Sequence, residues 1–542
     1  MSADLVIKGN AIFDSIADAP YQGAVVVKGN KIQKVLQGDA IRDINDYIND
    51  DTKVIDAGDR TVMAGFHDSH VHFLLAGLYQ TYPELTTCVS EQEVVDKVFE
   101  ASKAIEDKDG WMFGFGWYTS FWDVKVDPTK ASLDKAFPDR PVILLNAEAH
   151  GAWVNSKALE IAGITKDTKD PEAGIIIRDA NGEPTGYLHE GAVGLVTTYA
   201  MDFSKEQMKQ LIRAFFNGAK EFGITSINDV MPLYHGDIGD VSVYSEMDQS
   251  GELTTRVHAA PDLLGDLDKV LELKDKYTSD RLKINQVKQF IDGVSTTHTA
   301  LMLEDYTDAP GNKGVELYDF KAMGRAVPEA HKRGLSVKLH SCGDRSCRYA
   351  LDFYENAIKL YGKNECRHAI EHCEIVDPTD LPRFKELGII PSVQPEHIAI
   401  SQKFDEDPYF IAMGDERANR TWPLKTLLEL TGVLAIGSDC PVVDNNPFLE
   451  IYRGVTRLFN DGEPKGGWNP TQKLTLAEVL RSYTWGSAYG VRREDELGSL
   501  KAGNFADIIV IDRNLFGVPE SELIDGKVDV TIFDGNVIYE RK

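Results

Sequence analysis

At 542 residues the chain is longer than the roughly 100–200 residues of a typical domain, so a large core with accessory elements is expected. Hydrophobic residues make up 42% of it and no apolar run approaches the ~18 residues of a membrane span, which predicts a soluble protein without membrane partners. The formal net charge of −28 argues against a nucleic-acid partner, because unpaired acid repels the phosphate backbone.

The chain starts without the features of a secretory signal. Residues 1–8 have neither a basic region nor a long apolar stretch, so we expect a cytoplasmic protein. The 6 cysteines form no C-x-x-C pair, which favours buried thiols over a zinc finger or redox motif. Cys342 and Cys440 lie close in sequence to candidate residues discussed below.

Both ends of the chain are rich in short β runs. Residues 5–12 and 24–32 are broken by Gly-Asn, which is typical of tight turns, and residues 506–511 and 529–539 repeat this pattern. We therefore expect a small β-sandwich domain built from residues 1–63 and 491–542.

The middle of the chain, residues 64–490, alternates apolar runs with charged helical segments. Runs at 284–290, 335–340, 388–393 and 433–437 indicate βα order, and hence a parallel sheet or barrel. The segment 75–220 interrupts this rhythm with an aromatic cluster and a Gly/Pro-rich loop. We interpret it as an insertion after an early strand.

The strongest chemical signal is the pair His70-x-His72. Residues two apart on a strand point to the same side, so both imidazoles can reach one metal ion. By itself the pair also fits a polar strand. Further candidates lie at the C-terminal ends of later predicted strands, and on a barrel those ends converge on one face. They are Lys288, His340, His372 and Asp439.

With these motifs in order, the chain resembles the amidohydrolase superfamily, in its family-3 branch that includes N-substituted formamide deformylase-like enzymes. The resemblance covers nearly the whole chain. The matching stretches are 65–72, 151–159, 288–293, 367–372, 437–441 and 498–507. His67 departs from the family in replacing an apolar residue, and His340-Ser341-Cys342-Gly343-Asp344 is a variant of His-x-x-Gly-Asp.

The resemblance implies a fold, a reaction and a ligand set. The fold is an α/β class (β/α)8 TIM-like metal-dependent hydrolase barrel, and the reaction is hydrolysis of a small-molecule amide, formamide or cyclic amide. His70 and His72 would hold one divalent ion, and His340 and His372 a second. Lys288 would bridge them if carboxylated, because a bare ammonium cannot bind a cation. Asp439 would bind metal and act as general base.

Zinc is the expected metal, although iron or manganese suits the same nitrogen and oxygen ligands. The family often forms dimers, which leaves a homodimer open. Substrate contacts are expected from the insertion and from loops over the barrel mouth, where Trp117 and Phe121 belong to an aromatic run. The full set of expected substrate-binding residues is Trp117, His150, Asn155, Gln394 and His397.

Three alternatives accompany this interpretation. His368-Ala369-Ile370-Glu371-His372 matches the inverted zinc-protease motif H-x-x-E-H, but that motif requires a helix and the flanking residues predict a strand. A metal-free scaffold is disfavoured because the ligand set is complete. A metal-dependent lyase or isomerase uses the same ligands, so the sequence does not separate it from a hydrolase.

Overall fold

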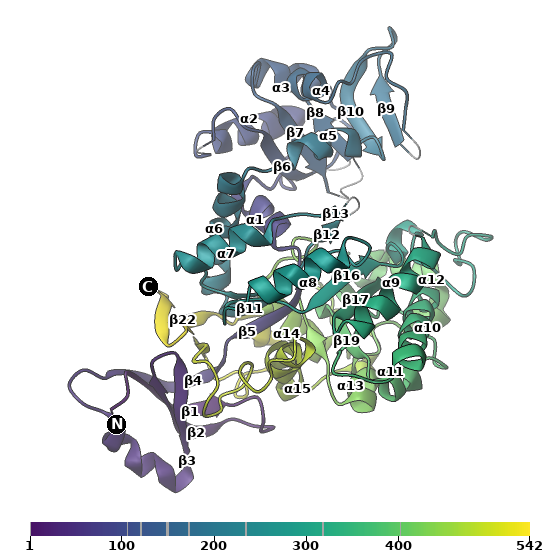
Figure 1. The fold of residues 1–542 in the computed structure, drawn as a ribbon. Helices are drawn as coiled ribbons and strands as arrows, with labels where there is room; N and C mark the ends of the chain where they lie inside the picture. Colours follow the sequence, from purple (N-terminus) through teal and green to yellow (C-terminus); the bar gives the residue numbers. More distant parts are fainter. Residues whose placement is uncertain are drawn as a thin grey trace. The chain divides into compact units, whose positions relative to one another are not determined.

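The computed structural model describes residues 2–105, 107–119, 122–147, 151–171, 174–233, 236–316, 319–401 and 403–542 (Figure 1). It divides into two compact units. Unit 1 comprises Met1–Phe73 and Phe216–Lys542, and unit 2 comprises Leu74–Phe215. Within the described residues, no helix is both long and apolar enough to cross a membrane.

Strands from both ends of the chain form one seven-stranded sheet in unit 1. Its order is β23 (Asn536–Glu540), β22 (Val528–Phe533), β21 (Ile508–Ile511), β4 (Lys53–Ala64), β1 (Leu5–Phe13), β2 (Tyr21–Lys28), β3 (Lys31–Gln37). Alternation places Leu5 and Ile7 in one apolar cluster, while Val6 enters another that the 3-10 helix η1 (Gly38–Tyr47) helps to form. Both faces are therefore buried, which explains the nearly continuous apolar runs.

Two parallel sheets make up the centre of unit 1. The first has the order β15 (Leu282–Ile284), β14 (Arg256–Ala260), β11 (Ile224–Val230), β5 (Phe66–Val71). The second has the order β16 (Gln286–Phe290), β17 (Ser336–Ser341), β18 (Ala369–His372), β19 (Ile390–Val393), β20 (Ala435–Ile436).

Isolated parallel bridges connect the two sheets at both ends. Val71 pairs with Cys440, and Asp262 pairs with Lys288. A closed barrel requires such links, because it has no free sheet edge. The carboxyl ends of β5 and β20 are consequently neighbours, although hundreds of residues separate them in sequence.

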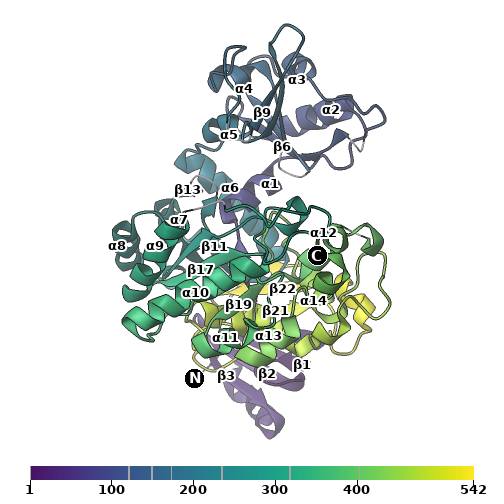
Figure 2. The ribbon, with the colours of Figure 1, turned by 90° about the vertical axis from the view of Figure 1, so that its right-hand side faces the viewer.

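Helices alternate with these strands, which confirms the mixed α/β class. For example, α9 and α10 pack against each other and against β17 (Figure 2). Aspartate side chains cap several N-termini, including that of α9, where Asp319 accepts backbone N–H groups. The helices of unit 1 after its first strands are α7 (Val241–Gln249), α8 (Leu267–Lys276), α9 (Phe320–Lys332), α10 (Asp344–Tyr361), α11 (Leu381–Leu387), α12 (Pro408–Ala418), α13 (Leu424–Thr431), α14 (Pro447–Thr456), α15 (Leu476–Arg481) and α16 (Ser487–Gly490).

Unit 2 contains a five-stranded sheet covered by short helices. The strand order is β6 (Met112–Trp117), β7 (Val142–Asn146), β8 (Gly151–Val154), β10 (Pro184–Glu190), β9 (Gly174–Arg178). Its helices include α2 (Glu91–Ser102), α3 (Lys130–Ala136), α4 (Ser156–Ile161) and α5 (Gly194–Ala200). Trp117, Trp122 and Trp153 pack together in its core.

Candidate metal centre

Backbone pairing places the His-x-His segment beside Asp439. The N–H of Asp439 donates to the carbonyl of His70 at 2.7 Å, and the N–H of His72 donates to the carbonyl of Cys440 at 3.0 Å. Asp68 adds side-chain links, because its carboxylate accepts the N–H and the hydroxyl of Ser438 at 2.9 and 2.6 Å. Burial raises the pKa of Asp68 to about 6.

Four imidazoles surround the Asp439 carboxylate. Its Oδ1 lies 3.2 Å from His70 Nε2 and 3.4 Å from His72 Nε2. Its Oδ2 lies 3.7 Å from His397 Nε2 and 4.0 Å from His372 Nδ1. Burial by itself raises the pKa of Asp439, but the combined effect of His70, His72 and His372 outweighs it and holds the pKa well below its ordinary value. The group is therefore an anion.

The backbone is strained at two of these residues. His372 has φ 74° and Asp439 has φ 60°, both in the left-handed region that side chains with a Cβ rarely adopt. Such conformations cost of order 1–3 kcal/mol and gather where function requires a particular side-chain direction. The strain marks the same residues as the sequence motifs.

Several buried polar atoms at this site lack hydrogen-bond partners among the described residues. They include His70 Nε2, both ring nitrogens of His372, Asp439 Oδ1 and Lys288 Nζ. Leaving a buried polar group unsatisfied costs about 1–3 kcal/mol. This many unsatisfied atoms at one site therefore indicate that a ligand binds there. Imidazole nitrogens and carboxylate oxygens are the donors that divalent zinc, iron or manganese takes. The residues present therefore fit a metal ion.

Hydrogen bonds fix which ring nitrogen two of the histidines present. Nδ1 of His70 lies 2.5 Å from Glu371 Oε2, and Nε2 of His340 lies 3.1 Å from the carbonyl oxygen of Gly293. A carbonyl, or a carboxylate when ionised, only accepts, so these nitrogens carry the hydrogens. His70 thus offers the lone pair of Nε2, and His340 that of Nδ1.

Two fully buried lysines lie in register on neighbouring strands and differ in their partners. Lys338 donates to the carbonyl of Ser69 at 2.6 Å and lies 3.0 Å from Glu371, whereas Lys288 Nζ forms no hydrogen bond among the described residues. Burial lowers the pKa of Lys288 to about 8. The amine of Lys338 is thus occupied by its partners, whereas the amine of Lys288 is available for chemical modification.

The expected substrate-binding residues divide into two groups. Gln394, after β19, and His397, in the 3-10 helix η4 (Pro395–Ala399), are buried, and the Gln394 amide atoms lack hydrogen-bond partners among the described residues. Gln394 is therefore available to a ligand, while His397 faces Asp439. His150 and Phe121 lie outside the described residues.

Two other expected residues, Asn155 and Trp117, form hydrogen bonds within unit 2. All hydrogen-bonding positions of the Asn155 amide are used, because it accepts from Val142 and Ala158 N–H and donates to the Phe137 and Arg140 carbonyls. The indole N–H of Trp117, a fully buried residue, donates to the carbonyl of Leu144 at 2.8 Å. Both side chains therefore contribute to the interior of unit 2.

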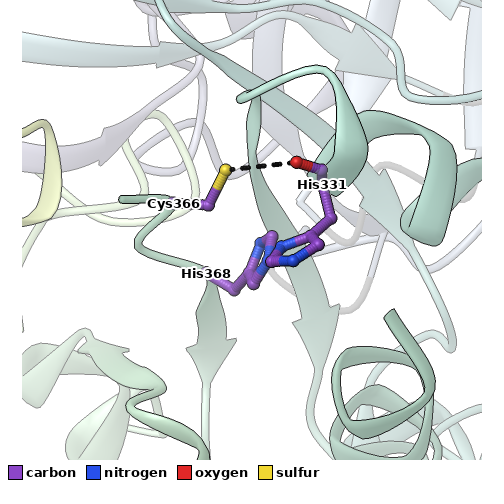
Figure 3. A group of neighbouring side chains, drawn as sticks. All are labelled: His331, Cys366 and His368. Carbon is purple, nitrogen blue, oxygen red and sulfur yellow. Dashed lines mark hydrogen bonds between the residues drawn. The ribbon is translucent and has the colours of Figure 1, made fainter. Parts of the chain in front are cut away.

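Apart from this centre, His331, Cys366 and His368 form a histidine–cysteine group whose two imidazoles already have hydrogen-bond partners (Figure 3). The N–H of Val337 donates to His368 Nδ1 at 3.0 Å, which leaves the hydrogen on His368 Nε2. That nitrogen donates to His331 Nδ1 at 2.9 Å, and His331 Nε2 donates to the carbonyl of Gly362 at 2.8 Å. A metal would have to break this chain of hydrogen bonds.

This arrangement also removes the inverted zinc-protease interpretation. The motif ends on strand β18 rather than on a helix, and His368 and His372 belong to different side-chain clusters. Glu371 and Lys338, which sequence reasoning did not assign to the site, lie beside His70. A charged residue inside a buried parallel strand needs a partner, so the charge of Glu371 and Lys338 within apolar runs is the sequence feature that could have identified them.

Two more buried carboxylates lie near the centre. Asp292 accepts the backbone N–H groups of Leu301, Cys342 and Gly343, and burial raises its pKa to about 7. Glu374 accepts the hydroxyl of Tyr409 at 2.6 Å, and burial raises its pKa to about 7 as well. Sequence reasoning missed both, because most of their partners come from other elements, such as Tyr409 on α12 and the residues that follow β17.

Parallel sheets joined at both ends, with histidines and an aspartate gathered where strands end, form the architecture of metal-dependent hydrolases. The chain belongs to the amidohydrolase family, whose model matches residues 53–539. This confirms the resemblance that the sequence motifs indicated.

Individual relatives match nearly the full chain. Protein LONG AFTER FAR-RED 3 of Arabidopsis thaliana is 30% identical over 99% of this chain and 92% of its own length. N-substituted formamide deformylase of Arthrobacter pascens is 25% identical over 96% of this chain and 95% of its own length. The solved structure of an uncharacterized metal-dependent hydrolase from Pyrococcus horikoshii OT3 covers 95% of this chain and 99% of its own, with TM-score 0.79 and 23% identity, which shows a shared fold.

Proposed function

We propose that the chain hydrolyses a non-peptide C–N bond of a small molecule, with Asp439 as general base beside bound divalent metal. The observation that carries the proposal is the buried Asp439 carboxylate, which faces four histidines. Among the described residues, His70, His372 and His397 each have a buried ring nitrogen without a hydrogen-bond partner, which supports a bound cation. The scaffold we propose is a closed (β/α)8 barrel, with a β-sandwich formed where the terminal sheet bends at its bulged strands β1 and β4.

The proposed ligands divide between two ions. His70, His72 and Asp439 would hold one, and His340 and His372 would hold the other, with Lys288, once carboxylated, as a further ligand. The buried Nζ of Lys288, which has no hydrogen-bond partner among the described residues, supports this modification, because a neutral amine is the form that reacts with carbon dioxide. We favour zinc, and iron or manganese suits the same donors. When bound, such metal supplies Lewis acidity and an activated water at neutral pH.

The chain's own residues would carry the proton and orient the substrate. Asp439 accepts a proton from the attacking water and delivers it to the leaving nitrogen as the C–N bond breaks, so an acid and an amine result. Gln394 offers both a donor and an acceptor to the substrate's amide group. His397, 3.7 Å from Asp439, donates to the carbonyl oxygen or to the nitrogen that leaves.

The substrate class we propose is an amide, formamide or cyclic amide. The name of the Arthrobacter pascens relative specifies an N-substituted formamide, which makes formamides the first compounds to test. Zinc- or manganese-loaded protein is given N-formyl, N-acyl and cyclic amides, and released amine is measured. Failure to cleave any amide at full metal occupancy would contradict the proposal. A product formed without addition of water would favour a lyase or isomerase. Purified protein that holds less than about half an equivalent of metal would favour a non-catalytic scaffold.

A further inference from the structure

A buried carboxylate and a buried lysine connect the two parallel sheets behind His70. Glu371 on β18 is fully buried, with Oε2 at 2.5 Å from His70 Nδ1 and Oε1 at 3.0 Å from Lys338 Nζ. Lys338 on β17 also donates to the carbonyl of Ser69, the residue before His70 on β5. The lysine therefore contacts both the carboxylate and the backbone of the strand that carries the histidine.

This arrangement determines which ring nitrogen of His70 is presented to the site. With Glu371 as acceptor, the hydrogen of His70 stays on Nδ1, and Nε2 points its lone pair toward Asp439 at 3.2 Å. The opposite tautomer would place an N–H, and a flipped ring a C–H, where a cation has to bind. His372 differs, because neither of its ring nitrogens has a hydrogen-bond partner among the described residues.

Lys338 has a separate role in this group. A lone carboxylate with no exposed surface is expensive to bury, and removing one partner of a buried ion pair leaves the other uncompensated. Lys338 balances the charge of Glu371, so the pair can present an acceptor to His70 at little net cost.

We propose that Glu371, held by Lys338, is a positioning residue that sets the tautomer and orientation of His70 as a metal ligand. The inference rests on the proposed metal centre and extends it to residues that do not touch the ion. The competing interpretation is an ion pair that only stabilises the barrel. Partners of this kind typically change metal affinity 10–100-fold when removed.

Two double variants separate these interpretations. Glu371→Gln with Lys338→Met keeps an amide oxygen that accepts from His70, while Glu371→Met with Lys338→Met keeps the volume and removes the acceptor. Both lack the lysine, so neither retains an uncompensated buried charge. Zn²⁺ affinity is measured by competition with a chelator, and folding by thermal unfolding of the metal-free protein.

A direct reading of the tautomer accompanies the affinity. Nitrogen-15 NMR of histidine-labelled, metal-free protein reports which ring nitrogen of His70 carries hydrogen, with the signal assigned from a His70→Gln variant. We call the double variant with Glu371→Gln the glutamine variant and the one with Glu371→Met the methionine variant. The glutamine variant should keep the hydrogen of His70 on Nδ1. The methionine variant should show a mixture of His70 tautomers and bind Zn²⁺ about 10–100-fold more weakly than the glutamine variant.

Equal Zn²⁺ affinity in the two double variants, with wild-type protein binding Zn²⁺ normally, would overturn the positioning role and leave the metal centre standing. Wild-type protein that binds no Zn²⁺ would overturn both the centre and this inference. A weaker methionine variant whose His70 nevertheless keeps its hydrogen on Nδ1 would also contradict the role.

Discussion

The backbone N–H of Asp439 donates to the carbonyl oxygen of His70 at 2.7 Å. This bond, with that from His72 N–H to the Cys440 carbonyl, aligns the chain after β20 with the end of β5. The position of Asp439 thus depends on main-chain bonds that asparagine, which also tolerates the φ of 60° at this position, leaves intact. Substitution of its carboxylate should change the chemistry of the site more than its shape.

Asp439→Asn is therefore expected to keep most bound metal and to lower kcat at least ~100-fold, because an amide cannot accept a proton from water. Metal content by elemental analysis and steady-state kinetics on a cleaved amide check this. Asp444→Asn, an exposed aspartate in the same loop, serves as the matched control and should retain activity. Near-wild-type turnover of Asp439→Asn would refute the general-base role.

Lys288 carries a prediction about metal stoichiometry. Without the lysine no carbamate can bridge the ions, so Lys288→Ala should bind less metal per chain and lose most of its activity. A short carboxylic acid such as formate, added to this variant, should restore part of both, because it offers carboxylate oxygens in the vacated space. Unchanged metal content and turnover in Lys288→Ala would show that the bridge is not needed.

The sequence predicted those features that repeat along the chain. Period-two alternation and apolar runs indicated strands at 335–340 and 388–393, where β17 and β19 lie. The run at 284–290 divides into β15 and β16, because Asn285 between them interrupts the pairing and its amide donates to the Val491 carbonyl.

Residues whose role depends on partners far along the chain were not predictable in this way. Glu371 meets His70 only because β18 and β5 face each other across the interior, 301 residues apart in sequence. Asn155 gives the converse case, since the amide of this motif residue, which we expect at substrate, is bonded to backbone groups within 18 residues of itself. Family motifs preserve residues that hold the fold as well as residues that act on substrate.

Arg256 should be a major contributor to the stability of unit 1. Its fully buried guanidinium, on β14, donates to both oxygens of Asp507 at 2.7 and 3.1 Å and also to Asp534. Arg256→Ala leaves the buried Asp507 carboxylate without its ion pair, while Asp534 retains that with Arg281, and should lower the free energy of unfolding by about 3–5 kcal/mol.

Urea-induced unfolding of the metal-free protein checks this value. Arg256→Lys should recover only part of the loss, because an ammonium cannot reproduce the planar fork. Arg541→Ala is the control, since its ion pair with Asp529 is partly exposed at 38% and 17% and should contribute less than about 1 kcal/mol. A loss in Arg256→Ala no larger than in this control would contradict the assignment.

His368 predicts a component of the acid sensitivity of the fold. Burial, with a smaller effect of His331, lowers its pKa to about 3, against about 6.5 for an unfolded histidine. Between these values the unfolded chain binds the extra proton, so the stabilisation is complete above about pH 6.5 and is lost as pH falls toward 3, at about 1.4 kcal/mol per pH unit.

His368→Gln should be less stable at neutral pH, since it breaks the chain of hydrogen bonds to His331. Its free energy of unfolding should fall less steeply with acid than that of the wild type, by about 1.4 kcal/mol per pH unit. Urea midpoints from pH 7 to 4 measure the slope, and metal content should stay at the wild-type level because His368 lies outside the metal centre. A variant with the wild-type slope would show that His368 is not held neutral in the folded protein.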